Sequence, residues 1–190
     1  MQKRKIYFLF DFPNISRSWA GLRRFEYLRD LIDWHQLKKC LKEHAHENYP
    51  GVLNLEFVVF LNRRTARESR GRIHTLKRSG FKVFPKRKTD DNSDIDDDIA
   101  EFISSAVRDP ETSAIYVLGN DLKNASAIAR MMELRQYQRI EGEPNKMTYD
   151  GEADLWVGIM PSTMMSSTNL DRFPGNTQVI NLEEFPGVFS

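Results

Sequence analysis

Two aspartates of this 190-residue chain stand directly after apolar, strand-like segments. Asp11 follows the run "IYFLF" and precedes a proline turn with Asn14, and Asp121 follows "SAIYVLG" and Asn120. A buried carboxylate is costly without a partner, and ligands of parallel α/β sheets bind beyond the carboxyl ends of the strands. We therefore expect both pairs at a functional edge. A simpler interpretation stays open, in which these side chains cap turns or the following helices.

The segment "KTDDNSDIDDDIAEFI", residues 88–103, holds six aspartates in nine positions. A helix capped by Ser93 and the favourable helix dipole explain one or two of them. Like charges one turn apart on a helix repel each other, whereas hard divalent cations such as Mg²⁺ and Mn²⁺ prefer carboxylate oxygens. The pattern predicts a metal site made by Asp11, Asp121 and one or two members of this cluster. A solvated acidic helix start is the alternative.

Basic residues are concentrated in the first half of the chain. Residues 1–88 hold 21 of the 28 lysines and arginines but only 8 of the 27 acidic residues. Such a charge asymmetry suits a polyanionic partner, whose phosphates must be held by cations. A helix over 65–79 places one basic stripe on a single side, and three more basic residues precede the acidic cluster. The candidate nucleic-acid-binding residues are Arg63, Arg67, Arg70, Lys86, Arg87 and Lys88, although an ordinary solvated basic face is the alternative for the stripe.

Strand-like and helix-like segments alternate along the chain, which favours an α/β fold with a mostly parallel sheet covered on both faces. The expected strands are 6–10, 53–61, 80–85, 113–119, 154–160 and 177–182. The expected helices are 34–47, capped by Asp33, then 65–79, 94–107, and one from 121 or 122 toward 138. The remaining long segments, 142–152 and 161–176, are rich in turn residues. We expect one domain over residues 1–190.

The composition narrows the class of protein. With 40% hydrophobic and 29% charged residues, the chain is typical of a globular protein rather than a disordered one. The single cysteine, Cys40, excludes an internal disulfide framework and a multi-cysteine metal site. We expect a reducing, cytoplasmic setting and no membrane partner, because no signal-peptide pattern or membrane-spanning apolar run is present.

Several short motifs resemble those of one nuclease family. "FDFPN" (10–14) is similar to the first-strand Asp-x-x-Asn of NYN domains, a group of PIN-like nucleases that includes the Regnase-type ribonucleases. Asp96 and Asp97, followed by "DIAEFI", resemble the aspartate pair at a helix start in that family, and "IYVLGND" (115–121) resembles its fourth-strand ending. "LKRSGFKVF" (76–84) and the tail from "GIMPS" to "TQVINLEEF" are also similar, so the resemblance covers nearly the whole chain in order.

The resemblance implies a three-layer α/β/α Rossmann-like (PIN-like) domain that hydrolyses RNA with Mg²⁺ or Mn²⁺. The substrate would be single-stranded RNA, cut endonucleolytically, with single-stranded DNA and a second copy of the chain as further candidate partners. The family's catalytic positions correspond to Asp11, Asn14, Asp96, Asp97 and Asp121. The metal ligands would be Asp11, Asp97, Asp98 and Asp121, with the choice open among Asp94, Asp96, Asp97 and Asp98.

The chain also departs from the family pattern. Gly119 stands where a small hydroxyl residue is common, and Lys123 stands where one form of the family has a second carboxylate. An alternative function is therefore a catalytically weak or inactive NYN module that binds RNA or a protein partner. A haloacid-dehalogenase-type phosphatase is disfavoured, because Pro13 occupies the position of its second aspartate.

Overall fold

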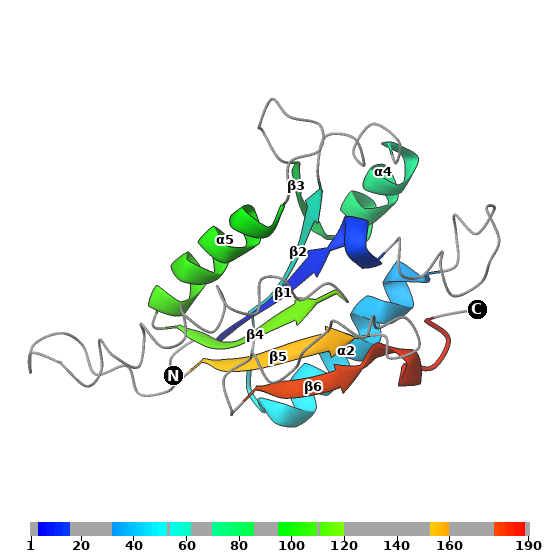
Figure 1. Cartoon of the computed structure of the whole chain (residues 1–190). Coiled ribbons are helices and arrows are strands. Elements are labelled where there is room, and N and C mark those ends of the chain that lie inside the picture. Colours follow the sequence, from blue (N-terminus) through cyan, green and yellow to red (C-terminus); the bar gives the residue numbers. More distant parts are fainter. Residues whose placement is uncertain are drawn as a thin grey trace, which may run out of the picture.

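Six parallel strands form one sheet in the order β3-β2-β1-β4-β5-β6 (Figure 1). The computed structural model describes residues 4–15, 32–52, 54–61, 70–85, 95–109, 111–119, 153–159 and 177–188. The strands are β1 (Lys5–Asp11), β2 (Asn54–Leu61), β3 (Lys82–Pro85), β4 (Thr112–Leu118), β5 (Asp154–Ile159) and β6 (Gln178–Asn181). All six predicted strands are confirmed, and the sheet is parallel throughout.

The order of the strands reverses between β1 and β4. β1 pairs with β2 on one side, where Asp11 is level with Phe60, and with β4 on the other, where Phe10 is level with Leu118. The chain therefore leaves β1 toward one half of the sheet and leaves β4 toward the other. A crevice forms at such a reversal, because the two connections diverge from neighbouring carboxyl ends.

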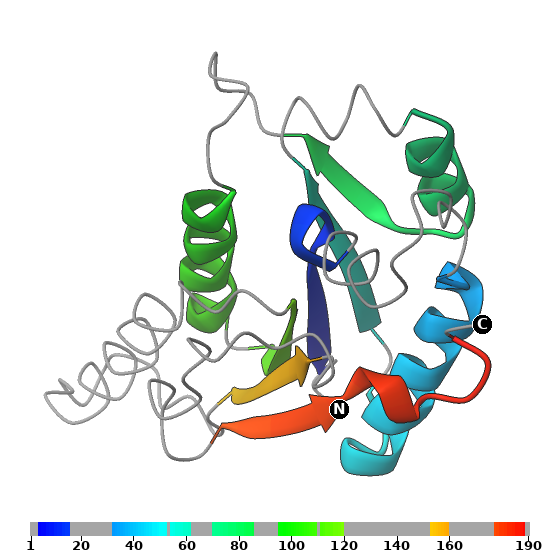
Figure 2. The same ribbon diagram turned by 45° about the vertical axis from the view of Figure 1, so that its right-hand side comes forward.

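Helices cover both faces of the sheet, as predicted (Figure 2). α2 (Trp34–Asn48) and α4 (Arg70–Arg78) lie on one face, and α5 (Asp96–Arg108) lies on the other. Leu37, Leu41 and Leu76 pack with Phe8 and Phe10 in the first layer of the core. The second layer joins α5 to the opposite side chains of the same strands. The inner strands β1, β2, β4 and β5 are thus buried on both sides over most of their length, which explains their nearly continuous apolar sequences, whereas the edge strands β3 and β6 are partly exposed.

The predicted helix boundaries are partly confirmed. Asp33 caps α2 as expected, because its Oδ1 accepts hydrogen bonds from the backbone N–H groups of His35 and Gln36, both at 2.9 Å. α4 begins at Arg70 in the described part of the chain, and residues 65–69 and the expected helix from 121 toward 138 lie outside it. Among the described residues, no helix is long and apolar enough to cross a bilayer.

The start of α5 corrects one expectation. The helix begins at Asp96 rather than at residue 94, and the residue at its N-cap position is Ile95, which makes no side-chain cap hydrogen bond. Ser93, the expected cap, lies outside the described residues. Ile95 and Ile99 are both buried in the core layer beneath the helix. Apolar anchoring therefore fixes the start of this helix, in place of the expected polar cap.

Candidate active site at the carboxyl edge of the sheet

Asp11 is a nearly buried carboxylate, 9% exposed, at the last position of β1. Residues 12–15 turn at once into a helix, and Oδ1 of Asp11 accepts the backbone N–H of Asn14 at 3.0 Å. Pro13 has no N–H to donate, so the cap bond must come from the third helical residue. Phe12 and Ile15 are buried and anchor the turn. The capping interpretation of Asp11 is therefore confirmed, and the same contacts hold its carboxylate in one place.

Gly119 brings the end of β4 against this turn. A Cβ built on Gly119 would lie 3.2 Å from Cβ of Asp11 and 3.9 Å from Oδ1 of Asn14. The backbone N–H of Gly119 donates to the carbonyl of Gly158 at 3.1 Å, which fixes its height beside β5. The structure thus places Asp11, Asn14 and Gly119 together at the reversal of strand order. A serine here, as in the related pattern, would crowd Asp11 through its Cβ, so glycine suits the close approach.

The first turn of α5 lies at the same edge of the sheet (Figure 1). The other end of this helix is at the amino edge, where Asp109 bonds the first residue of β1, so Asp96 is at the carboxyl end. Asp98 is half-buried. The backbones of Asp96 and Asp97 are helical, but their side chains are not among those described. Topology therefore brings the acidic segment to the edge that carries Asp11.

The structure describes one of the remaining predicted site residues, and the others lie outside the described part of the chain. Arg70 is exposed at the first position of α4. Outside the described residues lie Asn120, Asp121, Arg63, Arg67, Lys86, Arg87 and Lys88. Within the described residues, no group of three histidine, cysteine, aspartate or glutamate side chains could hold a metal. The donors at the edge, Asp11 and Asp98, are nevertheless hard oxygen ligands of the kind that Mg²⁺ and Mn²⁺ take.

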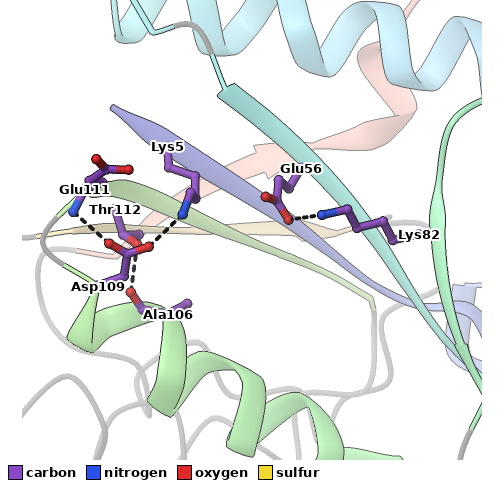
Figure 3. Close-up of polar contacts among 7 residues, drawn as sticks. All are labelled: Lys5, Glu56, Lys82, Ala106, Asp109, Glu111 and Thr112. Atoms are coloured by element: carbon purple, nitrogen blue, oxygen red, sulfur yellow. Dashed lines mark hydrogen bonds and ion pairs between the residues drawn. The ribbon is translucent and has the colours of Figure 1, made fainter. Parts of the chain in front are cut away.

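The amino edge of the sheet has a different chemistry (Figure 3). Nζ of Lys5 donates to Oδ2 of Asp109 at 2.7 Å, and the backbone N–H of Glu111 donates to Oδ1 of Asp109 at 3.0 Å. Burial, the largest single influence, opposes the ionisation of Asp109, but the hydrogen bonds from Lys5 and Glu111 and the charge of Lys5 together outweigh it and lower the pKa of the carboxyl group. The hydroxyl of Thr112 donates to the carbonyl of Ala106 at 2.7 Å. These groups close the joint between α5 and β4.

A polar and aromatic network, which the sequence reading missed, lies under the second half of α2. The hydroxyl of Tyr49 donates to Oδ2 of Asp154 at 2.7 Å and accepts the indole N–H of Trp156 at 2.7 Å. Nδ1 of His44 lies 3.2 Å from the hydroxyl of Tyr116, whose ring stacks on Trp156 at 5.5 Å. Burial lowers the pKa of His44 and raises that of Tyr116. In the sequence, the only indication of this network is that polar residues lie next to apolar, strand-like segments.

No family model, curated protein or solved structure matches this chain. Function must therefore be inferred from the residues themselves and from their positions in the sheet.

Proposed function

We propose that the protein is a metal-dependent ribonuclease that hydrolyses phosphodiester bonds of single-stranded RNA endonucleolytically. The observation that carries the proposal is the position of Asp11, fixed beside Asn14 and Gly119 where the strand order reverses. The order β3-β2-β1-β4-β5-β6 is that of Rossmann-type sheets, which bind ligands at this point. It supports the assignment to a Rossmann-like, PIN-like fold and to the NYN family that the motifs resemble.

The donor set at this edge fits a divalent cation. Asp11 comes from the end of β1, Asp97 and Asp98 come from the first turn of α5, and Asp121 follows β4 in sequence. Together they would hold Mg²⁺ or Mn²⁺, with Asp96 as the other candidate from the cluster. Such a cation activates water and neutralises charge on a phosphate.

Residues of the chain would hold the metal ligands and the RNA in position. The helical turn after β1 fixes the Asp11 carboxylate, because one oxygen is held by the N–H of Asn14. The side-chain amide of Asn14 lies near Gly119, where the strand order reverses, and in the proposed mechanism it would orient a phosphate oxygen or a water. The basic residues Lys86, Arg87 and Lys88 directly precede the acidic cluster and would hold the phosphates on either side of the cleaved bond.

A second candidate function is an RNA-binding module that does not cleave. Two observations favour it: the Asp11 carboxylate already caps the turn after β1, and Gly119 replaces the usual hydroxyl residue. A module of this kind binds RNA in EDTA, loses affinity as salt rises and yields no product.

Cleavage of labelled single- and double-stranded RNA and DNA, each with Mg²⁺, Mn²⁺ or EDTA, tests the proposal. We expect products from single-stranded RNA with either metal and none in EDTA. The Asp121→Asn protein, purified in parallel, controls for a contaminating nuclease and should be inactive. Equal cleavage by that variant would refute the assignment of Asp121, and binding without any cleavage would establish the second candidate.

A further inference from the structure

A half-buried lysine, Lys38, links helix α2 to the residues that follow α4. Nζ of Lys38 donates to the carbonyls of Ser79 and Gly80, at 2.7 and 3.1 Å, just beyond the end of α4. The same ammonium lies over the rings of Phe57 and Phe81, at 4.8 and 5.2 Å from their centroids. Capping the last carbonyls of a helix with a cation is favourable. These contacts tie α2 to the segment that follows α4, and so they position one helix relative to the other.

A shallow open groove of about 480 Å³ lies between the start of α2 and the end of α4. His35 lines it from α2, and Thr75, Arg78, Ser79 and Gly80 line it from the other side. Arg78 can donate to an anion from its guanidinium, Ser79 from its hydroxyl and His35 from a ring N–H. The backbone N–H groups of Ser79 and Gly80 already donate to the carbonyls of Thr75 and Lys77, and the hydroxyl of Thr75 donates to the carbonyl of Gly71. The lining is polar rather than apolar, which favours a charged ligand over a hydrophobic one.

The two helices beside the groove carry mostly positive charge. The sequence of α4, "RGRIHTLKR", contains no acidic residue, and neither helix has one in its first turn. Two acidic residues lie farther along α2, and one of them, Glu43, is 4.0 Å from Lys39. Burial, and then the nearby charge of Lys42, lower the pKa of Lys38, so positive charges are crowded here. The exposed basic side chains of the two helices are His35, Lys39, Lys42, His46, Arg70, His74, Lys77 and Arg78.

The groove begins beside the candidate active site. Trp34, the first residue of α2, stacks on Phe12 with ring centroids 5.5 Å apart. Phe12 directly follows Asp11, and His35 directly follows Trp34. One aromatic pair therefore separates the catalytic edge from the start of the groove.

We propose that the α2–α4 groove binds the phosphate backbone of single-stranded RNA on one side of the cleaved segment. The inference rests on the proposed function for the identity of the polyanion, but it concerns binding and does not require cleavage. Phosphate contacts of this kind position a strand without reading its sequence. The groove thus selects for length: an RNA long enough to span from Asp11 to Arg78 binds more tightly than one that fills only the catalytic edge.

Fluorescence anisotropy with a labelled single-stranded RNA in EDTA tests the proposal at salt concentrations from about 50 to about 200 mM. The test protein is Lys42→Gln with Arg78→Gln, which removes the basic side chain that lines the groove, Arg78, and an exposed lysine of α2 one turn beyond Lys38. The control is Arg4→Gln with Arg108→Gln, which removes the same charge from two exposed residues at the amino edge. We expect the groove variant to bind about tenfold more weakly and to lose about 0.7 from the salt slope per contact. The control should bind like the wild type, and Lys42→Arg with Arg78→Lys should retain most of the affinity.

Two results would overturn the groove proposal. One is an equal loss of RNA affinity in the groove and control variants, which would show that affinity depends on total positive charge and not on the groove. The other is that the wild-type protein binds vesicles of phosphatidylcholine and phosphatidylserine but does not bind RNA. This result would show that the basic surface binds membranes. The proposed nuclease function is tested separately: if the groove variant loses RNA binding while no protein cleaves RNA with Mn²⁺, the groove proposal stands and the nuclease proposal fails.

Discussion

The two edges of the sheet treat their carboxylates differently. At the amino edge, Asp109 is held by the ammonium of Lys5 and by a backbone N–H, so a full positive charge balances the carboxylate within the protein. At the carboxyl edge, Oδ1 of Asp11 accepts the backbone N–H of Asn14, which lies only three residues farther along the chain. The helix that joins the two edges, α5, ends beside the balanced pair and begins in a run of aspartates.

We infer from this contrast that the charges at the amino edge serve folding, and we propose that those at the carboxyl edge serve function. Salt bridges and hydrogen bonds at the amino edge, including Tyr49 with Asp154, join elements that are far apart in sequence. These contacts hold the helices against the sheet at the amino edge. Under the proposed function, aspartates at the carboxyl edge bind a cation, which a negative local potential favours. Substitutions at the first edge should therefore change stability, and those at the second should change activity.

Asp11→Asn should have the largest effect of all, and only on activity. Asparagine caps a helix about as well as aspartate, so we expect the free energy of unfolding to change by less than about 0.5 kcal/mol. Loss of a metal-ligating charge should lower the rate of RNA cleavage by more than about a hundredfold. Single-turnover cleavage and urea denaturation measure the two quantities. Asp109→Asn serves as the control, and a comparable loss of cleavage in that protein would erase the distinction between the edges.

Asp109→Ala should have the opposite profile. It removes both acceptors of the amino-edge pair and leaves the Lys5 ammonium, which is 18% exposed, without its carboxylate. We expect a loss of about 2 kcal/mol in the free energy of unfolding with cleavage unchanged. Because the folded-state pKa of Asp109 is lowered, its stabilisation is complete above the ordinary value of 3.8 and disappears as the pH falls through the folded pKa.

Denaturation of the exposed-site variant Glu111→Ala, two residues away, provides the comparison for Asp109→Ala. It should change stability by no more than about 0.5 kcal/mol. Equal effects of the two substitutions would mean that the Lys5 pair contributes nothing.

Gly119→Ala and Gly119→Ser distinguish the effect of an added Cβ atom from the effect of an added hydroxyl group at the carboxyl edge. The added Cβ meets Cβ of Asp11 at 3.2 Å, so both variants should lose about 1 kcal/mol of stability. Only the serine can donate a hydrogen bond to Asp11 or Asn14. If the hydroxyl supports the site, the serine variant will cleave RNA faster than the alanine variant at equal stability. Identical rates would show that a hydroxyl at this position has no role.

The smallest expected effect is a pH dependence at His44. Burial lowers its pKa in the folded protein, so the unfolded chain takes up a proton first as the pH falls below 6.5. The stabilisation is thus present above that pH and decreases below it. His44→Phe keeps a ring against Trp156 and should flatten the dependence of stability on pH between about 5 and 8. His46→Gln, at an exposed position of the same helix, should retain the wild-type slope; a flattened slope there would contradict the assignment to His44.

Much of the fold could be predicted because its strands are buried on both faces. Continuous apolar runs such as that of β1 identify such strands directly, and helices between them require a parallel sheet. Asp11 was informative for the same reason, since a charge at the end of a buried run must have a partner. The sequence left two roles open for it, and the capping bond now shows that one role does not exclude the other.

The contacts that could not be predicted join distant parts of the chain. Lys38 bonds carbonyls 41 and 42 residues away, and Tyr49 meets Asp154 across 105 residues. Local patterns contain no information on such pairs, because each depends on how the helices dock on the sheet. The start of α5 was misplaced for a related reason: local capping rules favoured Ser93, whereas burial of Ile95 against the sheet fixed the helix.

The central claim is that the carboxyl edge holds a divalent cation and that the amino edge does not. Titration of Mn²⁺ into the RNA-free protein, followed by electron paramagnetic resonance, tests it without depending on catalysis. We expect saturable Mn²⁺ binding by the wild type and by Asp109→Asn, and loss of this binding in Asp11→Asn. Binding that is unchanged in Asp11→Asn, or absent from the wild type, would contradict the claim.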